Sequence, residues 1–342
     1  MRLACFSFAI LALVLGVVPP GHAQVSPDVI DAAKKEGRVS FYTPLITDQV
    51  VRPLAAAFRA KYGIQVDFSR MDSNLVILKI LNEFRAKQGV ADVFTTSLGI
   101  EELIQSGAIR QYHAESANDL PRQFKDIHGY WVADRVYILG PAINTNLVPL
   151  VDRPKGFEDL LLPKWTGKIA WRPNDLTGAP GFIGNVLLSM GEDKGMTYLK
   201  KLAGQKPITL QMSDRAVLDQ VVGGEYPLAL SITNHNVGIS RKDGAPVAWL
   251  PFEPAMVLTE QMGLTKLGPH PNAGLLFIEF ALSREGQSVF QKAGYVPSRP
   301  DVPPLDPELS PTTGHFRANI VPPDVVEKNH RHWDDVYRQL FR

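Results

Sequence analysis

The sequence predicts an α/β protein divided into two domains. Segments with the alternating pattern of β-strands are repeatedly followed by segments whose apolar residues recur at helical spacing, and this alternation is typical of a parallel sheet flanked by helices. The chain has 342 residues, more than a single hydrophobic core usually serves, so two domains are expected. Its composition, 45% hydrophobic and 21% charged, is that of an ordinary globular protein.

The first α/β unit comes directly after an apolar N-terminal stretch. Its predicted strands are 37–44, 64–70 and 91–97. Its predicted helices are 47–63 and 73–89, both amphipathic. Gly63 stands where the first helix should stop, because glycine readily takes the left-handed conformation of a helix end.

A second α/β unit begins near 131–146 and continues through alternating apolar and polar segments. A long amphipathic helix is predicted at 272–294, and another helix at 325–341. Between them, residues 299–323 are rich in proline and are expected to cross the surface without regular structure.

Residues 1–23 have the pattern of a cleaved secretory signal peptide. Arg2 precedes the apolar run 3–18, and small residues lead to a predicted cleavage after Ala23. The run is short for a transmembrane anchor. The only cysteine, Cys5, lies inside this segment, so we expect a cysteine-free mature protein that is exported to the periplasm. The net charge of +1, without a dense basic stripe, argues against a nucleic-acid partner.

Polar side chains stand at the carboxyl ends of three predicted strands. These ends are Tyr42-Thr43, Ser69-Arg70 and Thr95-Thr96-Ser97. In parallel sheets, ligands bind just beyond the carboxyl ends of the strands. Any one of these hydroxyl residues is equally well explained as a turn former, but the coincidence of three ends favours a binding site.

Four later segments carry a resemblance to a known family. They are DVFTTS (92–97), LLLPKWTGKIAWRPND (160–175), DQVVGGEYPLALSITNHN (219–236) and SREGQSVFQKAGYVPSRPDV (283–302). In this order and spacing they resemble the periplasmic solute-binding proteins of ABC importers, specifically the ferric-iron-type branch, over nearly the whole mature chain. The resemblance implies a type II periplasmic-binding-protein fold, in which two α/β lobes joined by crossing strands enclose a ligand cleft. The lobes expected are 24–130 with 254–312, and 131–253 with 313–342.

The iron ligands of that branch are replaced in this sequence. Ferric members hold iron with a histidine, a glutamate and two adjacent tyrosines, and the matching positions are Ile46, Ser97 and the pair His235-Asn236. Ferric iron needs anionic oxygen ligands, which an alkyl group, a hydroxyl and an amide do not provide. We therefore expect neither a metal nor a cofactor.

The resemblance also implies an anion pocket, and that part of the pattern is retained. Thr177-Gly178-Ala179 match the turn on which ferric members hold their anion, and Asn234 matches an asparagine beside it. Independently, a glycine-containing loop that opens a helix favours an anion at the helix N-terminus. Plain N-capping by Thr177 is the alternative. Ser213 or Asp214 is predicted to cap a second helix, with Arg215 in its first turn.

These observations predict that the protein binds a small anionic organic solute, which is a phosphonate, an organophosphate or a carboxylate. The protein is expected to be a monomer that closes about a hinge on the solute and delivers it to an ABC permease of the inner membrane. Asn234, His235 and Asn236 are expected to end a strand and face the cleft. Arg70 is the expected clamp on the anion, with Arg135 and Arg172 as alternatives. The predicted ligand-binding residues are Tyr42, Thr43, Arg70, Thr96, Ser97, Arg135, Tyr137, Thr177, Gly178, Ala179, Ser213, Asn234, His235 and Asn236.

Three other functions are alternatives to this one. An enzyme is disfavoured because the sequence has no nucleophile elbow, no HExxH and no phosphate-binding loop. His330 and His332 are not expected to bind a catalytic metal together, because they lie on different faces of a predicted helix. Ferric-iron binding with a synergistic anion and a non-tyrosine ligand set, such as His235 with Glu101 or Glu102, is the principal alternative. A polyamine or thiamine would call for acidic strand ends, which this sequence lacks.

Overall fold

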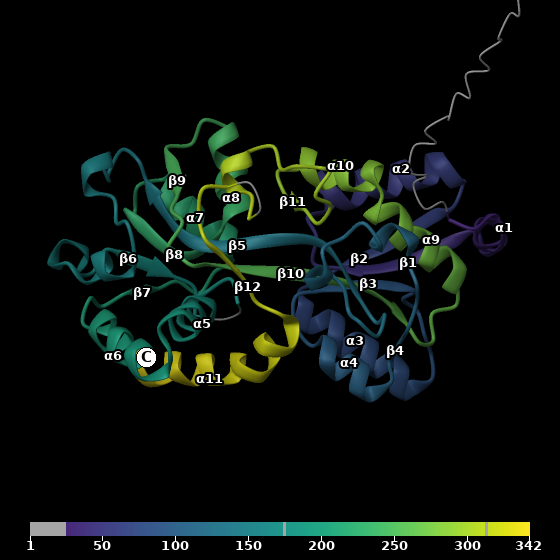
Figure 1. Cartoon of the computed structure of the whole chain (residues 1–342), viewed down its shortest axis with the longest axis horizontal. Coiled ribbons are helices and arrows are strands. Elements are labelled where there is room, and N and C mark those ends of the chain that lie inside the picture. The colour runs from purple at the N-terminus through teal and green to yellow at the C-terminus, as the bar shows by residue number, and fades with distance from the viewer. Residues whose placement is uncertain (1–24, 174–175, 312–313) are drawn as a thin grey trace, which may run out of the picture.

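A computed structural model describes residues 25–342 apart from 174–175 and 312–313, so the predicted signal peptide lies outside the described residues. Within the described part of the chain, the strands form one twelve-stranded sheet, with the main order β2-β1-β3-β10-β5-β8-β6-β7. Helices cover both faces of this sheet along its length (Figure 1). The α/β prediction is confirmed.

One half of the molecule is built on the β2-β1-β3 end of the sheet. Its strands are β1 (Arg38–Thr43), β2 (Gln65–Arg70), β3 (Val93–Thr96) and β4 (Ile109–Arg110). Its helices are α1 (Pro27–Glu36), α2 (Arg52–Tyr62), α3 (Ser73–Ala86), α4 (Ile100–Ser106), α9 (Pro271–Leu282) and α10 (Arg284–Lys292). As predicted, β1 pairs in parallel with both β2 and β3. The predicted helix 47–63 is a π-turn, η1 (Thr47–Val51), followed by α2.

The other half is built on the β8-β6-β7 end of the sheet. Its strands are β6 (Ile169–Trp171), β7 (Ile208–Thr209), β8 (Leu228–Thr233) and β9 (Val247–Trp249). Its helices are α5 (Ala179–Met190), α6 (Glu192–Ala203), α7 (Asp214–Val222), α8 (Asn234–Lys242) and α11 (Pro323–Phe341). The last helix, α11, packs along α5 and α6 and also reaches α4 of the first half. The lobe boundaries predicted from the sequence stay a prediction.

Two long strands pass through both halves. β5 (Val132–Asn144) and β10 (Ala255–Thr265) pair antiparallel at the centre of the sheet, with a bulge between Glu260 and Gln261. Every residue of both strands is buried. Two short strands, β11 (Val296–Pro297) and β12 (Ala318–Ile320), add to β5 and β10 respectively. These paired strands connect the two halves at the centre of the sheet.

The prediction of one long helix at 272–294 was wrong in one respect, because the structure has two helices there. α9 ends at Leu282 and α10 begins at Arg284. Between them, Ser283 accepts a hydrogen bond from the backbone N–H of Gly286 at 3.2 Å and so caps α10. A Cβ at Gly286 would lie 2.1 Å from the backbone oxygen of Phe280, so the chain turns sharply there.

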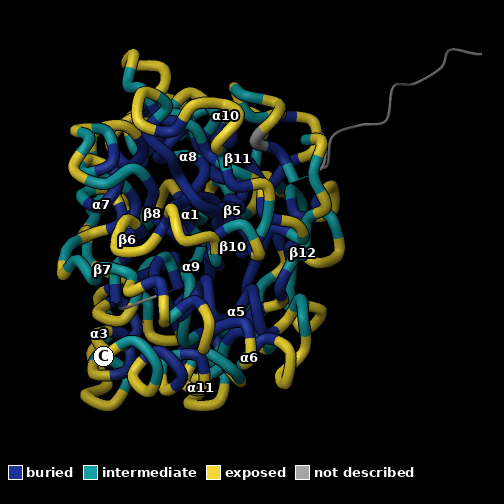
Figure 2. Tube along the Cα trace, turned by 90° about the vertical axis from the view of Figure 1, so that its left-hand side faces the viewer, coloured by how far each residue is buried: buried dark blue, intermediate teal, exposed yellow. Residues whose placement is uncertain are grey.

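The buried apolar residues of the described chain form three hydrophobic clusters. Figure 2 shows the buried central strands enclosed by half-buried and exposed helices and loops. Trp171, Phe41 and Phe277 are among the fully buried side chains. No helix among the described residues has the length and apolar character needed to cross a membrane.

Candidate functional site

A cavity of about 1000 Å³ lies between the two halves of the molecule. On one side it is lined by η1 of the first half and by the C-terminal end of α10. On the other side it is lined by α8 and the first turn of α7. Its lining residues are Ile46, Gln49, Arg215, Asn236, Gly238, Ile239, Arg241, Lys242, Asp243, Lys292, Ala293, Gly294, Val296, Pro304, Leu305, Asp306 and Pro307.

Cationic side chains outnumber carboxylates around this cavity. The cations are Arg215, Arg241, Lys242 and Lys292, and the carboxylates are Asp243 and Asp306. Arg241 pairs with Asp306 at 3.3 Å, and Arg215 pairs with Asp219, one turn further along α7, at 3.0 Å. The remaining excess of positive charge favours an anionic occupant.

Two polar contacts, one at the start of α5 and one beside this cavity, are related through the charge of Arg172. Arg172 Nη1 donates to Thr177 Oγ1 at 3.0 Å. The charge of Arg172 also acts on Asp214, whose Oδ2 accepts from Asn236 Nδ2 at 2.6 Å. Asn236 in turn lines the cavity. Thr177 therefore contacts Arg172, Asn236 contacts Asp214, and the charge of Arg172 acts on Asp214 across the gap between these two pairs.

Asp214 is the buried carboxylate among these contacts. Burial raises its pKa to about 6, against the opposing effects of hydrogen bonds from Thr233 and Asn236 and of the charge of Arg172. Thr233 Oγ1 donates to Oδ2 at 2.8 Å, whereas Oδ1 is buried and has no hydrogen-bond partner among the described residues. The sequence pointed to Asp214 only as a helix cap. The cap of α7 is Ser213, which accepts from the N–H of Ala216 at 3.3 Å.

The turn at Thr177-Gly178-Ala179 lies at the start of α5 as predicted, but some of its hydrogen-bonding groups already have partners within the protein. Gly178 is the N-cap residue, and no side chain caps the helix. The N–H of Ala179 donates to the backbone oxygen of Arg172 at 2.8 Å. Thr177 therefore does not act as a plain N-cap, and its hydroxyl faces a guanidinium.

The polar segment Asn234–Asn236 does not end a strand, which corrects the prediction. β8 ends at Thr233, and these three residues form the first turn of α8. Asn234 is fully buried, and its Oδ1 accepts from the N–H of Ile138 at 3.1 Å, so it ties the start of α8 to β5.

His235 stacks on Tyr295. The two ring centroids are 4.3 Å apart and the planes are inclined by 22°. Burial, and after it the charge of Arg135, lowers the pKa of His235 to about 3, so the imidazole is neutral. Its Nδ1 has no hydrogen-bond partner among the described residues. Tyr295 was missed from the sequence; its one signal is its place within the motif that carries the family resemblance.

Arg135 lies in the centre of the molecule and is ion-paired on two sides. Its guanidinium contacts Asp134 at 3.0 Å and Glu260 at 3.3 Å, and it lies 5.4 Å from the ring centroid of Tyr295. These carboxylates raise its pKa despite its burial. The pKa of Asp134 is raised to about 6 by burial, against the effect of Arg135. Arg135 thus joins the two central strands to each other.

Predicted strand-end residues form hydrogen bonds with other residues of the first half. Thr43 and Thr95 are fully buried and share a hydrogen bond of 2.7 Å between their hydroxyls. Tyr42 donates to Glu83 at 2.7 Å, and this contact together with burial raises its pKa.

The remaining predicted residues differ in their exposure. Thr96 donates to the backbone oxygen of Leu98, and the Oγ of Ser97 lies 3.1 Å from that of Ser73. Arg70 is exposed, and its Nε donates to the oxygen of Pro44 at 3.4 Å. Tyr137 is a buried member of the core of the second half.

The alternative iron ligands are not assembled by the described residues. No group of three or more His, Cys, Asp or Glu side chains in that part of the chain could hold a metal ion. Glu101 lies in the first turn of α4, where its N–H donates to the carboxylate of Glu327 at 3.1 Å.

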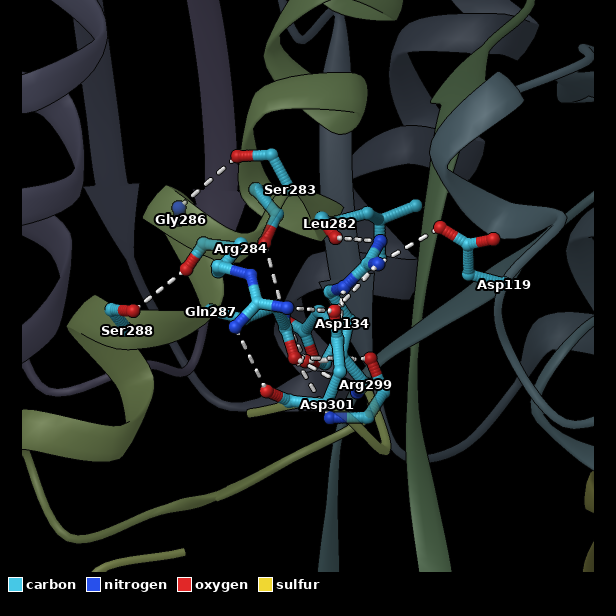
Figure 3. Close-up of polar contacts among 12 residues, drawn as sticks. Asp119, Asp134, Leu282, Ser283, Arg284, Gly286, Gln287, Ser288, Arg299 and Asp301 are labelled. Atoms are coloured by element: carbon cyan, nitrogen blue, oxygen red, sulfur yellow. Dashed lines mark hydrogen bonds and ion pairs between the residues drawn. The ribbon is translucent and has the colours of Figure 1, made fainter. Parts of the chain in front are cut away.

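A buried glutamine fixes the segment that carries Tyr295. Gln287 Nε2 donates to the backbone oxygen of Asp134 at 2.8 Å, and its Oε1 accepts from the N–H of Ser298 at 2.8 Å. Arg299 pairs with Asp119 at 2.8 Å and with Asp301. Figure 3 shows Gln287 and Arg299 joining α10, the segment that follows it and β5. The family-like motif therefore anchors this segment to a central strand.

Comparison with known proteins gives consistent results. A family model described as bacterial extracellular solute-binding protein matches residues 88–315. A protein of Salmonella typhimurium, described as a putative 2-aminoethylphosphonate-binding periplasmic protein, is 24% identical over 288 residues, which cover 82% of this chain and 81% of that protein.

Solved structures of similar fold include two iron-related proteins. The iron-bound HitA of Pseudomonas aeruginosa aligns with a TM-score of 0.74 and 22% identity, over 89% of this chain and 99% of HitA. The ferric binding protein of Campylobacter jejuni aligns with a TM-score of 0.75 and 19% identity, over 88% and 99% of the two chains. At these identities the likeness establishes the fold.

Proposed function

Because the chain belongs to the bacterial extracellular solute-binding protein family, we propose that it is the periplasmic component of an ABC importer that captures a small anionic organic solute. The solute class is a phosphonate, an organophosphate or a carboxylate. The partner is a permease in the inner membrane, and the protein reaches the periplasm as a monomer after cleavage of residues 1–23.

The observation that carries the anionic assignment is the charge around the cavity between the halves. Four cationic side chains and two carboxylates line it. The Salmonella typhimurium relative, described as a putative 2-aminoethylphosphonate-binding protein, supports a phosphonate-like solute. The volume of about 1000 Å³ is of the size that organic ligands occupy in proteins.

The mechanism is closure of the two lobes, 24–130 with 254–312 and 131–253 with 313–342, about β5 and β10. A solute that contacts both lobes stabilises the closed form, which the permease recognises. Asn236 and Arg215 serve the anion from the second lobe, and Lys292 serves it from the first. Arg70, the clamp expected from the sequence, is not among the residues that line the cavity.

The experiment is native mass spectrometry of protein purified from the periplasm without refolding, compared with the mass after unfolding. A non-covalent organic anion that is lost on unfolding supports the proposal. A loss that matches iron, alone or with a small anion, refutes it and favours ferric-iron binding with a synergistic anion and His235 in a non-tyrosine ligand set.

Substitution provides a second test once the solute is identified. Arg215→Ala and Lys292→Ala are each expected to weaken binding about tenfold, because each removes a cationic side chain that lines the cavity. Isothermal titration calorimetry measures the affinity, and circular dichroism checks the fold. An unchanged affinity in both variants would show that the anion binds elsewhere.

A further inference from the structure

The two halves of the molecule meet in an aromatic contact beside the cavity. His235 belongs to the first turn of α8 in the second half. Tyr295 belongs to the short link between α10 and β11, and α10 packs on α9 and α2 in the first half. Their rings are stacked at 4.3 Å. The contact therefore joins elements that would move apart if the halves rotated about β5 and β10.

A second contact at the same place shows how closely the surfaces fit. A Cβ at Gly294 would lie 2.9 Å from Cγ1 of Ile239, so α8 packs directly on the backbone at the end of α10. Gly294 has φ +84°, a conformation that favours glycine. One turn of α8 thus presents both His235 and Ile239 to residues 294–295.

The Tyr295 side of this contact is rigidly held. Gln287 joins α10 and Ser298 to the backbone of β5 at Asp134. The next residue along β5, Arg135, lies 5.4 Å from the centroid of the Tyr295 ring. Arg135 is itself ion-paired with two carboxylates, so the Tyr295 ring lies beside a fixed guanidinium as well as stacking on the imidazole.

We propose that the His235–Tyr295 stack is a latch that holds the two halves of the molecule closed before any solute binds. This inference rests on the proposed function only in taking β5 and β10 as the hinge. An aromatic pair of this kind shifts an equilibrium roughly two- to twelvefold beyond the effect of area burial. A latch of this size raises the population of the closed form, so less of the solute's binding energy is spent on closing the protein.

The test measures the closed and open populations of the solute-free protein. The mature chain has no cysteine, because the single cysteine of the sequence is Cys5. Dyes can therefore be attached at two introduced cysteines, Ala60→Cys on α2 and Glu225→Cys after α7, both at exposed positions. Single-molecule energy transfer then reports the separation of the halves, and small-angle scattering reports the overall size.

Tyr295→Ala and His235→Ala are each expected to move the population toward the longer separation and to lower the closed-to-open ratio two- to twelvefold. The double variant should lose no more than the larger single effect, because both substitutions remove the same contact. Tyr295→Phe and His235→Phe keep an aromatic ring and should stay closed. Urea unfolding of each variant confirms that it folds.

Two results would overturn the latch. One is an unchanged distribution in both alanine variants; the other is opening by Tyr295→Phe equal to that by Tyr295→Ala, since the ring is still present. No solute is added in this experiment, so a wrong assignment of the solute leaves the outcome decisive.

Discussion

Replacement of the buried Gln287 is expected to destabilise the protein strongly. The side chain is fully buried and makes two donor and several acceptor contacts. Nε2 donates to the backbone oxygens of Asp134 at 2.8 Å and Ala281 at 2.9 Å. Oε1 accepts from the N–H groups of Ser298 at 2.8 Å and Arg299 at 3.3 Å. Gln287→Ala removes all of these contacts at once.

The expected loss follows from the backbone groups left behind. A buried polar group without a partner costs about 1–3 kcal/mol, and the two N–H groups of Ser298 and Arg299 lose their acceptor. Adding a modest term for the space vacated by the side chain gives a decrease of about 3–5 kcal/mol in the free energy of unfolding. Urea denaturation followed by tryptophan fluorescence measures this value, provided that the slope with denaturant is unchanged.

Gln291, one turn later on the same helix, provides the matched control. Its Nε2 donates to the backbone oxygen of Pro303 at 2.6 Å, in a solvent-exposed contact. Gln291→Ala should cost about 0.5 kcal/mol, because water replaces the lost partner. A loss below about 1 kcal/mol for Gln287→Ala, or equal losses in the two variants, would refute the view that Gln287 anchors α10 to β5.

Two further predictions concern acid and a close backbone approach. The pKa of His235 is lowered to about 3 in the folded protein, so below pH 6.5 the unfolded chain gains a proton that the folded one does not. Unfolding should therefore become easier on acidification: between pH 7 and pH 5 the wild type should lose about 2 kcal/mol more than His235→Phe in urea titrations. The buried carboxylates with raised pKa values, Asp214 among them, make the folded protein more stable on acidification, but they are present in both proteins and cancel when the two losses are subtracted. Equal losses in the wild type and in His235→Phe would contradict the neutral imidazole. Gly181→Ala should destabilise by about 1–3 kcal/mol in thermal unfolding, because its Cβ would lie 1.8 Å from the backbone oxygen of Leu176. Gly156→Ala, where a Cβ meets nothing within 4 Å, is the control, and a similar effect in both would show that space at Gly181 is not limiting.

Much of the fold could be predicted from the sequence because its signals are local. Hydrophobic periodicity and the helix-stop residue Gly63 identified the first three strands and the helices between them. The break at Ser283 was missed because the apolar pattern continues across it, and its cause is a sharp turn at Gly286, not a change in periodicity. The spacing of apolar residues indicates which face of a helix is buried, but it does not indicate whether the helix is continuous.

The candidate site was harder to predict because its contacts join distant residues. Arg135 was predicted as one alternative to Arg70 for the anion clamp, yet one of its partners, Glu260, lies on the other central strand. Tyr295 was overlooked although its ring meets His235. Nothing in the sequence near either residue indicates these partners. The predicted helix starts were confirmed, because Thr177 lies just before α5 and Ser213 is the N-cap of α7.

The position of α11 has a consequence for how the protein is made. Trp333 of this helix is almost fully buried, and a Cβ at Gly184 of α5 would lie 2.6 Å from its ring. Tyr337 packs on Trp171 with ring centroids 5.9 Å apart. α11 follows in the sequence all the segments that it covers, so it leaves the ribosome after them. Between the synthesis of α5 and that of α11, the face of α5 around Gly184 lacks the cover that Trp333 provides.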